Sequence, residues 1–430
     1  MKLRFWGATE GVTGSATFVG LPEGTLLVDC GLYQGDEATE KLNLNSLPVP
    51  PSEISAIIIT HAHLDHTGYL PRLVKQGFRG PIHCTLPTAH LMRIILLDSA
   101  KLAEDQFYET SDVTQTMSLI RPHALDEHFE LLGASITIQS AGHILGAASI
   151  SIKALGKKIV FSGDLGREVD PLLPPHHPAP KADVLILEST YGGKSRKDNM
   201  EKELHSFLMT VSRESRVGII ASFAVARGQL LLELIHEFFE RHPEEKVRVV
   251  MDSPMMKEAN AVYMRFAGLT NASDKLINTL KEVDAIDFAG EWETLKKKKG
   301  PLIILSSSGM VSGGRITRHL YNWKDDESAI LFLPGYQGEG TPGRALAAGK
   351  RELKHAGRNF TWKGEVRTSD AFSSHADQGE LIRWATENNS SPRIFLIHGE
   401  KEGKLILKKK LEERGVSIVD VPARGSQYEI

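Results

Sequence analysis

The chain has 430 residues, of which 41% are hydrophobic and 24% charged, the proportions of an ordinary globular protein. This length exceeds a single typical core, so we expect two domains. A net charge of −3 excludes a basic surface over the whole protein, so any nucleic-acid site must be a local patch.

Neither end of the chain nor its interior predicts export or a membrane span. No apolar run approaches the ~20 residues that a membrane helix needs, and the N-terminus has no signal-peptide pattern. Two cysteines are too few for a disulfide framework. We therefore expect a cytoplasmic protein with no membrane partner.

The first segment predicts short strands between glycine-rich turns, over residues 3–6, 16–19 and 26–28. The third of these strands ends at Asp29. Two interpretations of Asp29 stay open on the sequence alone: a residue that caps the turn, or one that orients a neighbouring metal-binding loop.

The next segment gathers four possible metal ligands at a turn between a buried strand, residues 56–59, and a helix that follows Gly68. The ligands are three imidazoles and one carboxylate within six residues, His61, His63, Asp65 and His66. Imidazole nitrogen and carboxylate oxygen suit zinc at an open site. Because the donors point in two directions, the motif can serve two neighbouring metals.

Two further donors follow at strand ends. Strands are expected over residues 134–139, 147–152 and 158–161; His143 lies between the first two, and Asp164 follows the third. Glycines flank both residues, so the backbone can approach a ligand closely there. Strands joined by short turns, with helices before and after them, predict two sheets between layers of helices.

The pattern changes near residue 194 to alternating helices and strands, which predicts a parallel α/β unit that continues to about residue 364. A strand is then expected over residues 360–367. Two more histidines follow it: His375 in a serine-rich turn, and His398 at the end of a buried strand.

In their settings, the motif at residues 61–66, His143 and Asp164 resemble the metal motifs of the metallo-β-lactamase superfamily. Residues 188–192, 374–377 and 396–399 resemble the three added motifs of its β-CASP branch. Within that branch the chain is similar to bacterial and archaeal relatives of the cleavage-and-polyadenylation endonuclease subunit, which are related to RNase J.

The resemblance implies an α/β fold: an αββα metallo-β-lactamase sandwich with an inserted α/β β-CASP domain. The sandwich would comprise residues 1–193 and 365–430, and the inserted domain residues 194–364. RNA would bind in the cleft between the two domains.

The resemblance also implies two zinc ions per chain. One ion would be held by His61, His63 and His143, and the other by Asp65, His66 and His398, with Asp164 bridging. A hydroxide shared by the ions would attack the phosphodiester and leave a 5'-phosphate. Asp65 and Asp164 would thus belong to the catalytic set.

Further roles carry over from the family. His375 would protonate the leaving oxygen or stabilise the charged phosphate, Glu188 would orient His375, and Asp29 would brace the histidine loop. The turn of Ser307, Ser308, Gly309 and Met310, a landmark of the subgroup, would bind a substrate phosphate. A simple helix N-cap is the alternative for this turn.

RNA-directed members carry a histidine at the position of His398, whereas DNA-directed members carry an apolar residue, so we expect an RNA substrate. A DNA nuclease, a hydrolase of small esters and a catalytically weak RNA-binding scaffold are the alternatives. Endonuclease and 5'-exonuclease modes both stay open, as does a homodimer through strand 417–421 and the tail 425–430.

Overall fold

The computed structural model describes the chain except for residues 103–106, 197–198, 272, 283, 286–294, 298, 339 and 389–390. The described residues form two compact units. Unit 1 comprises Met1–Ser195 and Ser374–Ile430, and unit 2 comprises Arg196–Ser373. The domain boundaries expected after residues 193 and 364 stay a prediction. Among the described residues, no helix is both long and apolar enough to cross a membrane.

Unit 1 contains two seven-stranded sheets. The first has the order β22 (Gln427–Glu429), β1 (Lys2–Phe5), β2 (Thr17–Leu21), β3 (Gly24–Val28), β4 (Ile54–Ile58), β5 (Ile82–Thr85) and β6 (Ile120–His123). The second has the order β21 (Ile418–Asp420), β20 (Arg393–Leu396), β11 (Val184–Leu187), β10 (Lys157–Phe161), β9 (Ala147–Ala154), β8 (Ala134–Gly142) and β7 (His128–Leu131).

The inner faces of the two sheets form one hydrophobic core. Along β8, Ala134, Ile136 and Ile138 are buried while the residues between them are partly exposed, the alternation of a strand with one core face. The same core receives Leu3 and Ile58 from the first sheet. Because both sheets contribute to one cluster, they pack as a sandwich.

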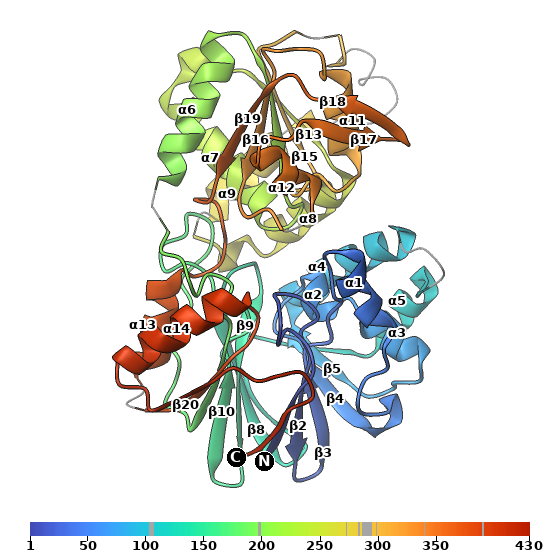
Figure 1. Ribbon diagram of the computed structural model, residues 1–430, viewed down its shortest axis with the longest axis vertical. Helices are drawn as coiled ribbons and strands as arrows, with labels where there is room; N and C mark the ends of the chain where they lie inside the picture. The colour runs from blue at the N-terminus through green and yellow to red at the C-terminus, as the bar shows by residue number, and fades with distance from the viewer. Residues whose placement is uncertain are drawn as a thin grey trace. The chain divides into compact units, whose positions relative to one another are not determined.

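Helices cover both outer faces of this sandwich. On the first sheet, α4 (Leu86–Leu102) contacts β5 and β6, and α5 (Thr110–Ser118) packs on α4. On the second, α13 (Gln378–Thr386) contacts β11, and α14 (Lys401–Glu413) contacts β21 (Figure 1). The expected αββα arrangement is confirmed.

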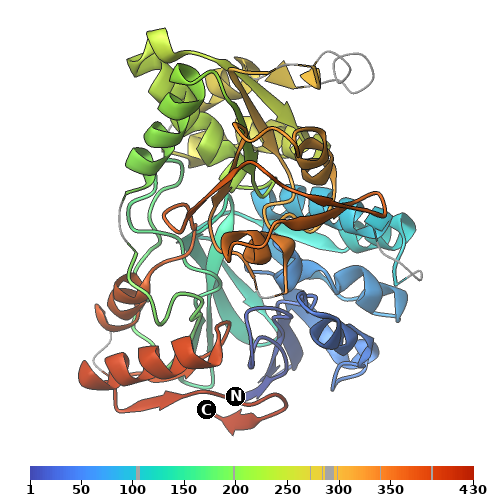
Figure 2. The same ribbon diagram turned by 45° about the horizontal axis from the view of Figure 1, so that its top comes forward.

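The two ends of the chain lie side by side in unit 1, as Figure 2 shows. Strand β22 pairs antiparallel with β1, and the Met1 amino group lies 3.2 Å from the Ile430 carbonyl oxygen. Strand β21 pairs with β20. Each of these C-terminal strands forms an edge of its sheet, so pairing with a second copy stays a prediction.

Unit 2 contains a six-stranded sheet in which every pairing is parallel. Its order is β14 (Asp284–Ala285), β13 (Arg248–Asp252), β15 (Leu302–Ser306), β12 (Val217–Ala221), β16 (Ile330–Pro334) and β19 (Glu365–Ser369). Its helices include α6 (Met200–Arg213), α7 (Arg227–Arg241), α8 (Pro254–Arg265), α9 (Ser273–Glu282), α11 (Arg315–Asn322) and α12 (Pro342–Ala347). Strands β12, β15 and β16 are buried along their whole length, so the sheet is covered on both faces.

The single strand expected over residues 360–367 is wrong. The structure has β18 (Arg358–Thr361), which pairs with β17 (Glu352–His355), and then β19, which joins the six-stranded sheet. Between them the Trp362 amide donates to the Arg351 carbonyl and the Lys363 amide to the Lys324 carbonyl. These partners lie outside both strands, so the chain changes sheets at this point.

Replacement of Phe395 by alanine should destabilise unit 1. The Phe395 ring is fully buried, 5.0 Å from the ring centroid of Phe5 and 4.6 Å from that of Tyr428. We expect Phe395→Ala to lower the free energy of unfolding by about 3–5 kcal/mol, measured by urea denaturation. The control Leu405→Ala, at a side chain 51% exposed on α14, should change it by less than about 0.5 kcal/mol.

Candidate metal centre

The candidate site residues of unit 1 lie where strands of both sheets end. Asp29 directly follows β3, Glu188 directly follows β11, and His398 comes just after β20. The others are His61 and His63 after β4, Asp65 and His66 in the short helix α2 (Leu64–Thr67), His143 between β8 and β9, and Asp164 after β10. The sandwich thus brings together donors that lie far apart in the sequence.

Three imidazoles and one carboxylate oxygen form the first group. His63 Nδ1 lies 3.1 Å from His61 Nε2 and 3.2 Å from His143 Nε2. Asp164 Oδ2 lies 3.5 Å from His61 Nε2 and 3.6 Å from His143 Nε2. A tetrahedral zinc ion with bonds of about 2.0–2.1 Å separates its ligand atoms by roughly 3.3–3.4 Å, so this group fits zinc.

The second group comprises Asp65, His66 and His398. His398 Nε2 lies 3.1 Å from His66 Nε2 and 3.2 Å from Asp65 Oδ2. The other oxygen of Asp164, Oδ1, lies 3.4 Å from His66 Nε2 and has no hydrogen-bond partner among the described residues. A buried carboxylate oxygen without a donor suits a cation, and Asp164 presents one oxygen to each group.

The protonation of the first group also fits a metal, which binds neutral imidazole. Burial lowers the pKa of His63 to about 4 and holds the pKa values of His61 and His143 well below the usual range. Burial opposes ionisation of Asp164, but the imidazoles of His398 and His66 outweigh it and hold the pKa of Asp164 well below its usual range.

Asp29 and Thr60 contact the ring nitrogens of His66 and His61 and so orient one histidine of each metal-binding group. Asp29 Oδ2 lies 2.8 Å from His66 Nδ1, and Asp29 Oδ1 accepts the backbone N–H of Thr60 at 2.8 Å. The Thr60 hydroxyl lies 2.9 Å from Asp29 Oδ2 and 3.1 Å from His61 Nδ1. Of the two interpretations of Asp29, these contacts favour the residue that orients the histidine loop.

His375 lies beside the first group and is fixed by Glu188. Its Nδ1 lies 3.2 Å from Glu188 Oε1 and 3.9 Å from Asp164 Oδ2, and its ring is 4.5 Å from that of His143. Glu188 is 1% exposed and accepts the backbone N–H groups of Leu165 and Thr190. The carboxylate is therefore oriented by the backbone, whereas the side chain of His375 stays 19% exposed.

Several residues at the site have a strained backbone. Asp29, His143 and His398 have φ angles of 58°, 44° and 52°, in the left-handed region that residues other than glycine rarely adopt. At Gly166 an added Cβ would lie 2.0 Å from the backbone nitrogen of His143, so only glycine fits against that turn.

Four residues to which the sequence analysis gave no role support the second group. The Thr190 hydroxyl lies 3.1 Å from His398 Nδ1. Lys404, 1% exposed on α14, donates from Nζ to the Thr9 carbonyl, and the adjacent Ala8 carbonyl accepts the His398 amide at 2.7 Å. Thr190 lies within the recognised motif of residues 188–192, but a lysine in a basic helix gives no signal of burial.

The turn from Ser307 to Met310 belongs to unit 2, between β15 and α11. The N-cap of α11 is Gly314, which makes no side-chain capping bond. The Ser307 hydroxyl instead lies 2.9 Å from the Ser253 hydroxyl. The Ser307 carbonyl, however, accepts the backbone N–H of Ile316 at 3.2 Å, in the first turn of α11. Helix capping and phosphate binding therefore both stay open for this turn.

Models of three protein families match the chain. The metallo-beta-lactamase superfamily model matches residues 9–202, and the Beta-Casp domain model matches residues 228–346. A third model, described as the Zn-dependent metallo-hydrolase RNA specificity domain, matches residues 362–422.

Similar proteins cover nearly the whole chain. It is 32% identical over 428 residues to Ribonuclease TTHA0252 of Thermus thermophilus, covering 97% of each chain. It is 31% identical over 435 residues to an RNase J-like protein of Methanocaldococcus jannaschii, covering 99% of this chain and 98% of that one. A crystal structure of a protein of unknown function from Enterococcus faecalis shares the fold, with a TM-score of 0.60, 15% identity and 99% coverage of both chains.

Replacement of Asp29 by asparagine should weaken metal binding without unfolding the chain. Asparagine has the same shape but carries no charge opposite His66, so we expect zinc affinity to fall roughly 10- to 100-fold. Competition with a chromogenic chelator measures this. The matched variant Asp183→Asn, at an exposed ion pair with Lys157, should keep wild-type affinity; equal affinity in both variants would contradict the role of Asp29.

Proposed function

Because the chain belongs to the metallo-β-lactamase superfamily and contains its Beta-Casp domain, we propose that it is a zinc-dependent ribonuclease. It would hydrolyse RNA phosphodiester bonds and leave 5'-phosphate products. One observation carries the proposal: Asp164 presents one oxygen to each of two groups of metal-binding side chains, with His375 beside them. The match to an RNA specificity domain and the name of the Thermus relative support RNA as the substrate.

We assign one zinc ion to each of the two groups of metal-binding side chains. His61, His63 and His143 would hold one zinc ion, Asp65, His66 and His398 the other, and Asp164 both. Zinc at such sites acts as a Lewis acid that activates water and offsets the charge of a phosphate.

His375 would handle the proton of the leaving group. In hydrolysis water adds to phosphorus, the bond from phosphorus to the 3'-oxygen breaks, and the departing oxygen takes a proton. His375 can donate that proton because its ring is partly exposed and its Nδ1 is directed to Glu188. The Glu188 carboxylate lies 3.2 Å from His375 Nδ1 and fixes the orientation of the ring, so Glu188 is a positioning residue.

The turn of Ser307, Ser308, Gly309 and Met310 would bind a phosphate of the same RNA. Its serine hydroxyls are not used to cap α11, and phosphate oxygens accept hydrogen bonds from hydroxyl and backbone N–H groups. A role for this turn adds a contact with the RNA backbone that is independent of base identity.

Replacement of His375 by alanine should slow cleavage while the metals stay bound. We expect a rate roughly 10²- to 10⁴-fold lower, the usual contribution of an acid–base group, with zinc content unchanged by elemental analysis. His128→Ala, at an exposed histidine on β7, serves as the control and should cleave at the wild-type rate. Wild-type turnover by His375→Ala would remove this residue from the mechanism.

The proposal as a whole is tested with two single-stranded oligonucleotides of the same sequence, one RNA and one DNA, each labelled at the 5' end. The zinc-loaded protein should cut only the RNA, and a chelator should abolish the reaction. The pattern of fragments separates internal cuts from removal of nucleotides at the 5' end.

The other outcomes each favour a different protein. A preference for the DNA would overturn the inference from His398 and indicate a DNA nuclease. If neither strand is cut although two zinc ions are bound, a small-ester hydrolase or an RNA-binding scaffold replaces the ribonuclease.

A further inference from the structure

The loop between β1 and β2, residues 7–15, folds into one compact segment that we call the N-terminal loop. Across this loop the Ala8 amide donates to the Thr13 carbonyl at 3.2 Å. At Gly7 an added Cβ would lie 1.6 Å from the Gly14 carbonyl oxygen, so the two arms of the loop meet backbone to backbone. Because the ends of the loop are closed, a contact at one point fixes the position of the whole loop.

The N-terminal loop contacts all three residues of the second metal-binding group. Its Ala8 carbonyl accepts the His398 amide at 2.7 Å, and its Ser15 amide donates to the Asp65 carbonyl at 2.8 Å. The buried Ser15 hydroxyl lies 3.4 Å from His66 Nε2, the ring nitrogen that faces His398. One segment of the chain thus supports the whole of the second group.

The first group has no such contact with the N-terminal loop. Among the described residues, no hydrogen bond joins the loop to His61, His63 or His143. These histidines are supported by other segments. The Thr60 hydroxyl lies 3.1 Å from His61 Nδ1, and Gly166 packs against the turn of His143. The N-terminal loop therefore supports the second group and not the first.

Lys404 of α14 fixes the N-terminal loop in place. Its Nζ donates to the Thr9 carbonyl, and the Gly399 amide, just before α14, donates to the Gly11 carbonyl at 3.1 Å. Lys404 is 1% exposed and forms no ion pair with a described carboxylate. A buried ammonium without a carboxylate costs free energy, and a methionine would fill a similar volume without that cost. Packing alone therefore does not account for this lysine, whereas its bond to the loop does.

From these observations we propose that Lys404 and Ser15 are positioning residues for the second zinc ion alone. Through the N-terminal loop they set the zinc affinity of the group of Asp65, His66 and His398, whereas the first group binds its ion independently of the loop. The inference rests on the two-zinc site of the proposed function. Because cleavage as proposed needs both ions, the loop also sets the zinc concentration at which the ribonuclease becomes active.

The test titrates the zinc-free protein with zinc in competition with a chromogenic chelator, and the wild type should bind two ions. Lys404→Met removes the ammonium and keeps most of the side-chain volume, and Ser15→Ala removes only the hydroxyl. Each should weaken one binding step roughly 10- to 100-fold and leave the other step unchanged. Lys409→Met, the same substitution at an exposed lysine of α14, is the control and should bind both ions as the wild type does.

A second titration identifies the step that is weakened. In His143→Ala a ligand of the first group is missing, so the ion that remains is held by the second group. In His398→Ala the remaining ion is held by the first group. Adding Lys404→Met should weaken zinc binding of the His143→Ala protein by the same factor and have no effect on the His398→Ala protein.

The inference is overturned if neither Lys404→Met nor Ser15→Ala changes zinc binding. It is also overturned if both steps weaken equally, since that result would indicate a general loss of structure. A single binding step in the wild type would overturn it as well, because the two-zinc site would then be wrong. Failure of the ribonuclease proposal is distinct: the wild type would bind both ions and cut no RNA, and the titrations decide on the loop without any cleavage.

Discussion

The carboxylate of Asp164 is the group on which the geometry of unit 1 depends. It is 2% exposed, and each oxygen lies within 3.6 Å of imidazole nitrogens of a different group. An ionised carboxylate at this depth is stable only where positive charge compensates it from both sides. The strand that precedes it, β10, lies in the middle of the second sheet, between β9 and β11, which is the most restrained position that the sandwich offers.

The remaining parts of unit 1 bring other side chains to this carboxylate. They also stabilise the strained backbone conformations of the residues that carry those side chains. Positive φ angles at Asp29, His143 and His398 each cost about 1–3 kcal/mol and persist only where the surroundings fix them. The surroundings here are specific: Thr60 binds Asp29, Gly166 leaves room for the His143 turn, and Lys404 holds the loop whose carbonyl binds the His398 amide. The core around Phe395 packs strand β1 against strand β22 and so holds the loops at the ends of the two sheets in fixed positions.

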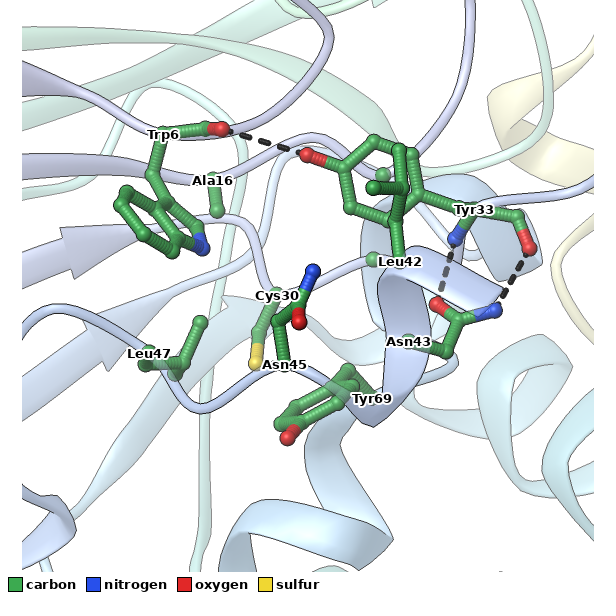
Figure 3. Close-up of a pocket in the computed structure, with 11 residues that line it drawn as sticks. Trp6, Ala16, Cys30, Tyr33, Leu42, Asn43, Asn45, Leu47 and Tyr69 are labelled. Atoms are coloured by element: carbon green, nitrogen blue, oxygen red, sulfur yellow. Dashed lines mark hydrogen bonds between the residues drawn. The ribbon is translucent and has the colours of Figure 1, made fainter. Parts of the chain in front are cut away.

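The loops that carry Asp65 and His66 also contact the backbone at Cys30 and Gly31. The Cys30 amide donates to the His66 carbonyl and the Gly31 amide to the Ser15 carbonyl. Both residues also line a small pocket that contains Trp6, Tyr33 and Tyr69 (Figure 3). At Gly31 an added Cβ would lie 1.7 Å from the Asp65 carbonyl oxygen, so the backbone at Gly31 is in direct contact with the loop that carries Asp65.

By itself the sequence determined most of the elements and named the donor side chains that the structure brings together. The apolar run of residues 56–59 predicted β4, and the donors of residues 61–66 were recognisable because they lie within one short turn. It failed at residues 360–367, where the apolar pattern is the same on both sides of Trp362 although the chain passes from one sheet to another. Only the tertiary structure decided which atoms meet: that Asp164 faces both groups, that Lys404 is buried against Thr9, and that Arg424 lies over Trp6. Such contacts join residues from distant parts of the chain, and local residue patterns carry no information about them because they form only when the two sheets pack.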